Sequence, residues 1–206
     1  MCVLYLVRHG QTAANAAGLL LGRADPPLTE LGRRQATAIA GALPPPARIV
    51  SSPLSRARDT AAAFGPAVEI DERWVEMDYG ELDGRPVASV SADLWSRWRT
   101  DPDFAPSGGE SLAAVGERVR RACTELAESA GGADVVVVSH VSPIKAAIAW
   151  ALGVSDAVAW RMYVEDAAVA RVDTGPPAPL LMSFNEVFPV RRVDEGDPGS
   201  APGDLA

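Results

Sequence analysis

The chain is poor in the residues that build metal clusters and disulfide frameworks. Its 206 residues include two histidines, His9 and His140, and two cysteines, Cys2 and Cys123. Two imidazoles are too few for a multi-histidine cluster, and no carboxylate–histidine set has metal-ligand spacing, so we expect no metal site. The cysteines fall in different predicted elements, which argues against a disulfide framework and favours a reducing compartment, the cytoplasm.

Lysine and long apolar runs are scarce as well. Lys145 is the only lysine, and no GxxxxGK[ST] sequence is present, which excludes a P-loop nucleotide site. No stretch approaches the ~20 apolar residues of a membrane span. The start, MCVLYLVRHG, has no basic leader and no cleavage site, so we expect no signal peptide. The 19 Lys+Arg and 27 Asp+Glu give a net charge of −8, which disfavours nucleic-acid and membrane partners.

The composition and the pattern of apolar residues are typical of a globular α/β chain. Apolar residues make up 48% and charged residues 22%, and the length suits one domain. Strand-like apolar runs occupy residues 2–7, 48–51, 68–70, 134–139, 167–173 and 180–185. Helical patterns occupy residues 29–43, 53–64, 93–99, 110–130 and 142–152. We therefore predict one domain over residues 1–190, with a hairpin between the last two strands, and a flexible Gly/Pro/acid-rich tail over 191–206.

Two predicted strands are followed by a pair that suits the start of a helix. These pairs are Ser52-Pro53 and Ser142-Pro143, with serine expected as N-cap and proline as the first helical residue. Open α/β sheets bind ligands beyond the carboxyl ends of their strands, and helix N-termini there favour phosphate. Three such strand ends carry cationic or imidazole side chains: Arg8-His9, Arg56 and His140. These residues predict a phosphate site at one edge of the sheet.

Four motifs stand in a characteristic order along the chain. They are Val7-Arg8-His9-Gly10-Gln11-Thr12 with Asn15, Ser51-Ser52-Pro53-Leu54-Ser55-Arg56-Ala57, Glu76 before Tyr79-Gly80, and Ser139-His140. Together they resemble the histidine phosphatase superfamily, and among its members the acid phosphatases and α-ribazole phosphatases in particular. The resemblance implies a phosphoglycerate mutase-like fold: a three-layer α/β/α sandwich whose central sheet is mostly parallel with an antiparallel edge.

The resemblance also implies a role for each of six residues. The catalytic residues are His9, the nucleophile that becomes phosphohistidine, Glu76, the acid and base, and His140, a donor to phosphate; Arg8, Asn15 and Arg56 bind the phosphoryl group. A transferring phosphoryl group spreads negative charge over its oxygens, and planar guanidinium groups match it well. Neither a metal nor a cofactor is implied.

Alternatives stay open for several of these residues. His9 could be a buried structural histidine, Arg56 a solvated surface charge, and Glu76 a member of a salt bridge. Three further carboxylates lie near Glu76 in sequence, so its assignment depends on the resemblance. Val141 stands where many family members have glycine, and its branched side chain restricts the approach of substrate to that backbone.

The segment between Glu81 and Gly109 is expected to cover the site and to select the substrate. It contains Trp95 and Trp98 at helical spacing, which favours a helix face packed on the domain. Lys145 follows Ser142-Pro143 by one turn, where a solvated helix lysine is the favoured interpretation.

The sequence thus predicts a phosphomonoesterase that hydrolyses a small phosphorylated metabolite through a phosphohistidine. The first alternative is a phosphomutase of the phosphoglycerate mutase type. The second is a phosphoryl-binding protein without catalysis. The identity of the substrate and the oligomeric state do not follow from the sequence.

Overall fold

A six-stranded sheet forms the centre of the computed structural model, which describes residues 2–175 and 177–190. The strands are β1 (Val3–Arg8), β2 (Arg48–Ser51), β3 (Val68–Ile70), β4 (Val135–Ser139), β5 (Val169–Asp173) and β6 (Leu180–Glu186). Their order across the sheet is β3-β2-β4-β1-β5-β6. The first four of these run parallel, whereas β5 is antiparallel to β1 and β6 is antiparallel to β5. The predicted mostly parallel sheet with an antiparallel edge is confirmed.

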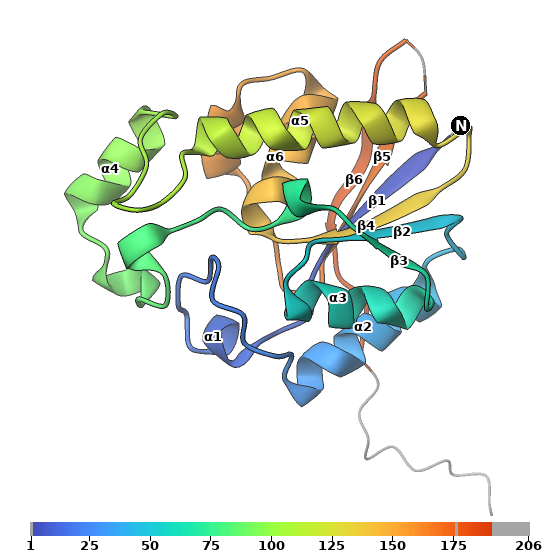
Figure 1. The fold of residues 1–206 in the computed structure, drawn as a ribbon, viewed down its shortest axis with the longest axis horizontal. Helices are drawn as coiled ribbons and strands as arrows, with labels where there is room; N and C mark the ends of the chain where they lie inside the picture. The colour runs from blue at the N-terminus through green and yellow to red at the C-terminus, as the bar shows by residue number, and fades with distance from the viewer. Residues whose placement is uncertain (1, 176, 191–206) are drawn as a thin grey trace, which may run out of the picture.

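Helices cover both faces of this sheet (Figure 1). The α-helices are α1 (Ala13–Ala16), α2 (Glu30–Ala42), α3 (Ser55–Ala61), α4 (Ala92–Thr100), α5 (Leu112–Ser129) and α6 (Val141–Leu152). The short 3-10 helices are η1 (Ala62–Phe64), η2 (Glu72–Trp74), η3 (Gly80–Leu82), η4 (Val87–Ser89) and η5 (Asp156–Arg161). In Figure 1, α2 and α3 lie below the sheet and α5 and α6 above it, which confirms the three-layer α/β/α sandwich.

Alternating side chains of each central strand enter two separate cores. Leu4 and Leu6 of β1 belong to the cluster packed against α5 and α6, whereas Tyr5 and Val7 belong to the cluster packed against α2 and α3. Both faces of the strand are therefore buried, which explains why β1 is a continuous apolar run instead of an alternating one. In the part of the chain that the structure describes, no helix is long and apolar enough to cross a membrane.

The predicted N-caps Ser52 and Ser142 are both wrong. α3 begins at Ser55 with Leu54 as its N-cap, and α6 begins at Val141 with His140 as its N-cap. The hydroxyl of Ser52 instead forms a hydrogen bond with the ring of His140. A tertiary contact thus replaces the helix-capping bond that the local sequence pattern predicts. Pro143 is the third residue of α6, where a backbone N–H has no intrahelical partner and a proline costs little.

The remaining predicted elements are found within about two residues of their expected bounds, as is usual for element ends. Thr29 caps α2 as predicted, and its hydroxyl accepts from Gly32 N at 3.0 Å. The tail predicted for residues 191–206 lies outside the described residues.

Candidate active site

His9 follows β1 at the carboxyl edge of the sheet and is buried. The next residue, Gly10, packs directly against the backbone of Gly32 in α2, where a Cβ atom would clash with the Gly32 carbonyl. Gly10 N also donates to Thr60 Oγ1 at 3.0 Å. Glycine is therefore required beside the histidine by the close approach of two backbones, and this contact fixes the position of His9.

Two contacts define the protonation of the His9 ring. Nδ1 lies 2.7 Å from Gly10 O, and because a carbonyl only accepts, Nδ1 carries the proton. Nε2 is therefore the unprotonated nitrogen, and it accepts from Arg56 Nε at 3.2 Å. Burial, followed by the charges of Arg56 and Arg8, holds the pKa of His9 well below its ordinary value of 6.5. A neutral imidazole with an unprotonated Nε2 is the form that can attack phosphorus.

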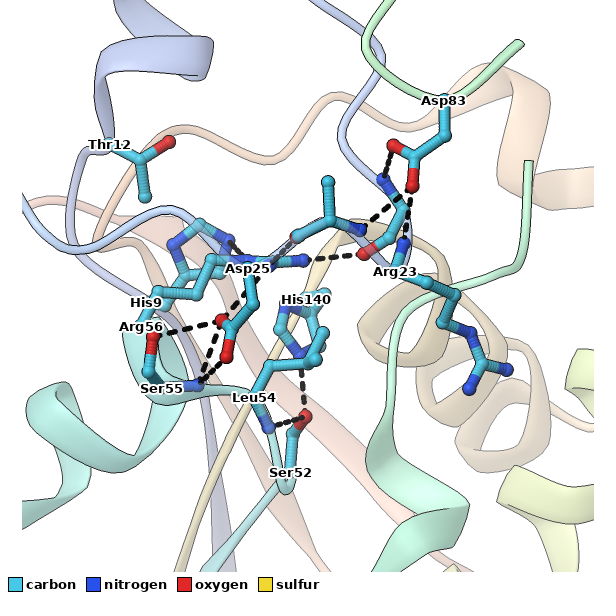
Figure 2. Close-up of polar contacts among 12 residues, drawn as sticks. His9, Thr12, Arg23, Asp25, Ser52, Leu54, Ser55, Arg56, Asp83 and His140 are labelled. Carbon is cyan, nitrogen blue, oxygen red and sulfur yellow. Dashed lines mark hydrogen bonds and ion pairs between the residues drawn. The ribbon is translucent and has the colours of Figure 1, made fainter. Parts of the chain in front are cut away.

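Arg56 lies in the first turn of α3, as predicted, and its side chain is fully buried. Its Nη1 donates to Ala24 O at 2.7 Å and its Nη2 donates to Gly22 O at 2.8 Å (Figure 2). The nearest carboxylate oxygen, on Asp25, is 3.7 Å away. The interpretation of Arg56 as a solvated surface charge is therefore wrong.

The loop that binds Arg56 is itself held by Asp83. One carboxylate oxygen of Asp83 accepts from Gly22 N at 2.8 Å, and the other accepts from Arg23 N at 2.9 Å and from Ala24 N at 2.8 Å (Figure 2). With its N–H groups satisfied in this way, the loop turns two carbonyls toward the guanidinium. The sequence analysis did not identify Asp83, because a lone aspartate before a glycine gives no sign of this contact.

His140 follows β4, and its ring centroid lies 5.1 Å from that of His9. Its Nε2 is 2.7 Å from Ser52 Oγ, which accepts from Leu54 N at 3.3 Å (Figure 2). Since Ser52 Oγ already accepts one hydrogen bond, we assign its proton to the bond with Nε2, which leaves the ring proton of His140 on Nδ1. This Nδ1 is buried and has no partner among the described residues. Burial, then His9 and the arginines, lower the pKa of His140 well below 6.5.

Arg8 is the last residue of β1, and its guanidinium forms a salt bridge with Asp166, an acid that the sequence analysis did not identify. Its Nη2 pairs with Asp166 Oδ1 at 2.7 Å, and its Nη1 donates to Val164 O at 2.7 Å. The Nε of Arg8 is buried without a partner among the described residues. Arg8 Nε and His140 Nδ1 are thus two buried donors without a partner among the described residues.

Glu76 is buried, and backbone donors hold its carboxylate. Its Oε1 accepts from Met77 N at 2.7 Å and from Ser142 N at 3.2 Å. Ser142 N belongs to the N-terminus of α6, which favours a nearby negative charge. Arg118 donates to the carbonyl of Glu76 at 3.4 Å and to that of Arg73 at 2.6 Å, which anchors the segment that carries Glu76. Among the described residues this carboxylate bonds to backbone N–H groups and forms no ion pair with a cation, so the simple salt-bridge interpretation is not supported.

Asn15 lies apart from this network. It is the third residue of α1, and its Oδ1 accepts from Thr12 N at 3.0 Å and from Thr12 Oγ1 at 2.8 Å. These bonds orient the amide and leave Nδ2 as its donor. The described residues contain no group of three or more His, Cys, Asp or Glu side chains that could hold a metal ion.

Comparison with known proteins identifies relatives over most of the chain. A model of the histidine phosphatase superfamily (branch 1) matches residues 4–187. A glucosyl-3-phosphoglycerate phosphatase from Mycobacterium tuberculosis is 41% identical over 154 residues, 66% of this chain and 69% of that protein. A probable phosphoglycerate mutase from Yersinia pestis is 32% identical over 184 residues, 84% of this chain and 85% of that protein.

The fold has solved relatives as well. A phosphoserine phosphatase from Entamoeba histolytica, in complex with 3-phosphoglyceric acid, superposes with a TM-score of 0.85 at 27% identity, over 91% of this chain and 98% of that one. The chain spans less than half the length of the first curated relatives it matches. These mycobacterial proteins are 42% identical over 159 residues, which cover 72% of this chain and 44% of each relative.

Proposed function

Because the chain belongs to the histidine phosphatase superfamily (branch 1), we propose that it is a phosphomonoesterase that works through a phosphohistidine at His9. The observation that carries this proposal is the protonation of His9, whose Nε2 is held unprotonated by the bond from Nδ1 to Gly10 O. The same nitrogen faces Arg56 Nε, a donor suited to a phosphoryl oxygen.

In the first step, His9 Nε2 attacks phosphorus and the bond between phosphorus and the ester oxygen breaks. Glu76, in its acid form, gives a proton to the leaving oxygen. Arg56 Nε, Arg8 Nε and His140 Nδ1 donate to the equatorial oxygens, where negative charge collects in the transition state. We propose Asn15 Nδ2 as a further donor.

In the second step, the carboxylate of Glu76 takes a proton from water as the water oxygen attacks the phosphohistidine. The bond between phosphorus and His9 Nε2 breaks, phosphate leaves, and both His9 and Glu76 return to their starting forms. These two reaction steps need no metal ion, because fixed guanidinium groups supply the positive charge that stabilises the transition state.

We propose a small phosphorylated metabolite as the substrate and the cytoplasm as the location. Relatives named as phosphatases of glucosyl-3-phosphoglycerate and of phosphoserine support a small phosphomonoester. Cys2 and Cys123 are both buried and unpaired, as is common in a reducing compartment. The relative named as a probable phosphoglycerate mutase keeps a phosphomutase as the second candidate.

The decisive experiment compares the wild-type protein with His9→Ala in the presence of EDTA. We expect the wild type to release phosphate from p-nitrophenyl phosphate and to carry radiolabelled phosphate on His9 after a rapid alkaline quench. The substituted protein should show neither, while circular dichroism shows an intact fold. Unchanged hydrolysis by His9→Ala refutes the proposal. Conversion between phosphoglycerate isomers that requires a bisphosphate primer, without net phosphate release, would favour the phosphomutase.

A further inference from the structure

A cavity of about 160 Å³ adjoins the site on the side of α4 and α6. Its walls include four aromatic residues, one serine and one lysine: Tyr79, Trp95, Trp98, Trp160, Ser142 and Lys145. Ser142 connects the cavity to the chemistry, because its backbone N–H donates to Glu76 and its hydroxyl lies 3.3 Å from Tyr79 Oη. A group that leaves with its oxygen next to Glu76 therefore has this cavity as its neighbour.

The aromatic walls form one packed cluster. Trp95 stacks on Trp98 with ring centroids 5.5 Å apart, and Trp160 meets both edge-on at 6.0 and 5.9 Å. Tyr79 contacts Trp98 edge-on at 5.6 Å. Mutual packing fixes these rings, so the cavity is a preformed space. Its volume is close to the ~150 Å³ of an engineered apolar cavity that binds benzene, and a six-membered ring fits it.

Lys145 supplies the one cation of the cavity wall, and it is held in no ion pair among the described residues, although the charge of Glu76 acts on it. It is the only lysine of the chain, it is half-buried, and it forms none of the ion pairs found in the described residues. The favoured interpretation from the sequence, a solvated helix lysine, does not describe this position in the cavity wall. Lys145 lies three residues after Ser142 on α6, so both side chains share one face of the helix.

Trp98, one of the lining residues, carries a buried donor without an acceptor in the described part of the chain. The indole Nε1 of Trp98 is buried and makes no hydrogen bond to any described residue. A buried donor without a partner costs free energy unless a ligand supplies an acceptor. The cavity thus combines a ring-sized aromatic space with one cation.

We propose that this cavity is the leaving-group subsite, and that it takes an alcohol built on a six-membered ring with one carboxylate that pairs with Lys145. This inference rests on the proposed phosphomonoesterase function. The single lysine balances one negative charge, and every other lining residue of the cavity is neutral. The subsite therefore selects a singly charged ring over a neutral ring and over a second phosphate group.

The test uses two esters of the same size, para-carboxyphenyl phosphate and para-carbamoylphenyl phosphate, whose rings differ in charge. The readout is the ratio of kcat/KM for the charged ester to that for the neutral ester. We expect Lys145→Met to lower this ratio about tenfold, which corresponds to about 1.4 kcal/mol, mainly through KM. Lys145→Arg should keep the ratio within about threefold of wild type, because the charge is retained.

The control is Arg121→Met, which removes one positive charge from an exposed position on α5 that does not line the cavity. It should leave the ratio unchanged. A ratio in Lys145→Met equal to that of Arg121→Met overturns the inference and leaves the phosphomonoesterase proposal intact. If the wild type hydrolyses neither ester nor p-nitrophenyl phosphate, the proposed function itself fails and the inference fails with it.

Discussion

Replacing Ser52 by alanine tests how His140 is prepared to donate to phosphate. The hydroxyl of Ser52 bonds to His140 Nε2 at 2.7 Å and is the only described partner of that ring, whose Nδ1 has none. Removal of the hydroxyl frees both ring nitrogens to exchange the proton. A fraction of the molecules then presents a lone pair, instead of an N–H group, to the phosphoryl oxygen.

The magnitude follows from the bond that is lost. A neutral hydrogen bond contributes about 0.5–1.5 kcal/mol net, so we expect Ser52→Ala to lower kcat/KM by about threefold to tenfold. The buried Nε2 and the Leu54 N–H also lose their partner, which costs roughly 1–3 kcal/mol of stability. For a chain of this length each kcal/mol lowers Tm by about 2–4 °C. Ser52→Thr keeps the hydroxyl and should recover most of the activity.

The assay measures kcat/KM for p-nitrophenyl phosphate, the inhibition constant of orthovanadate and Tm. Ser51→Ala is the matched control, because Ser51 is equally buried and its hydroxyl bonds to the Ser52 carbonyl at 2.9 Å rather than to His140. This control should lose stability with little change in the inhibition constant. The reasoning about His140 is refuted if Ser52→Ala and Ser51→Ala have the same kcat/KM and the same affinity for vanadate.

Two further predictions concern stability. The folded pKa values of His9 and His140 lie below their ordinary 6.5, so the unfolded chain binds more protons in mildly acidic solution and stability falls as the pH decreases. Between about pH 6.5 and about pH 5.5 the free energy of unfolding in urea should fall by about 1 kcal/mol per histidine, and a flat profile, or the same slope after replacing both histidines by glutamine, contradicts this. Gly10→Ala should lower Tm by at least about 4 °C, because its Cβ meets the Gly32 backbone. Gly41→Ala, in open space on α2, should raise Tm slightly, and equal effects of the two substitutions would disprove the steric argument.

The strands and the two histidines were predictable because their signals are local. β2 and β3 have the predicted bounds, since short runs that contain β-branched residues between breakers are typical of strands, although only β2 is buried and β3 is an exposed edge strand. His9 and His140 each stand one residue after a strand, and parallel neighbours bring such residues to the same edge of the sheet. The pairing of β1 with β4 therefore explains why residues far apart in the sequence have rings 5.1 Å apart.

The support of the site was not predictable, because it consists of contacts between distant residues. Asp166 and Asp83 are two of 27 acidic residues, and nothing beside them in the sequence distinguishes them from surface acids. Ser52 precedes a proline, a pattern that predicts a helix N-cap. In the structure its hydroxyl bonds to the ring of His140 instead. Local rules fail at such positions because the competing partner becomes visible only once the sheet has formed.

Arg56 shows how a chain with a net charge of −8 keeps a cationic group in the site, whereas Arg8 is paired with Asp166. Arg56 is compensated by the carbonyls of Gly22 and Ala24, which are dipoles, and its nearest carboxylate is 3.7 Å away. A carboxylate in direct contact would satisfy the guanidinium equally well, but it would cancel the charge that a phosphate dianion needs. The carboxylate of Asp83 instead accepts hydrogen bonds from the backbone N–H groups of the same loop, which positions the two carbonyls. The positive charge next to His9 is thus permanent, and the imidazole can stay neutral and nucleophilic, because Arg56 and not a histidine supplies the charge.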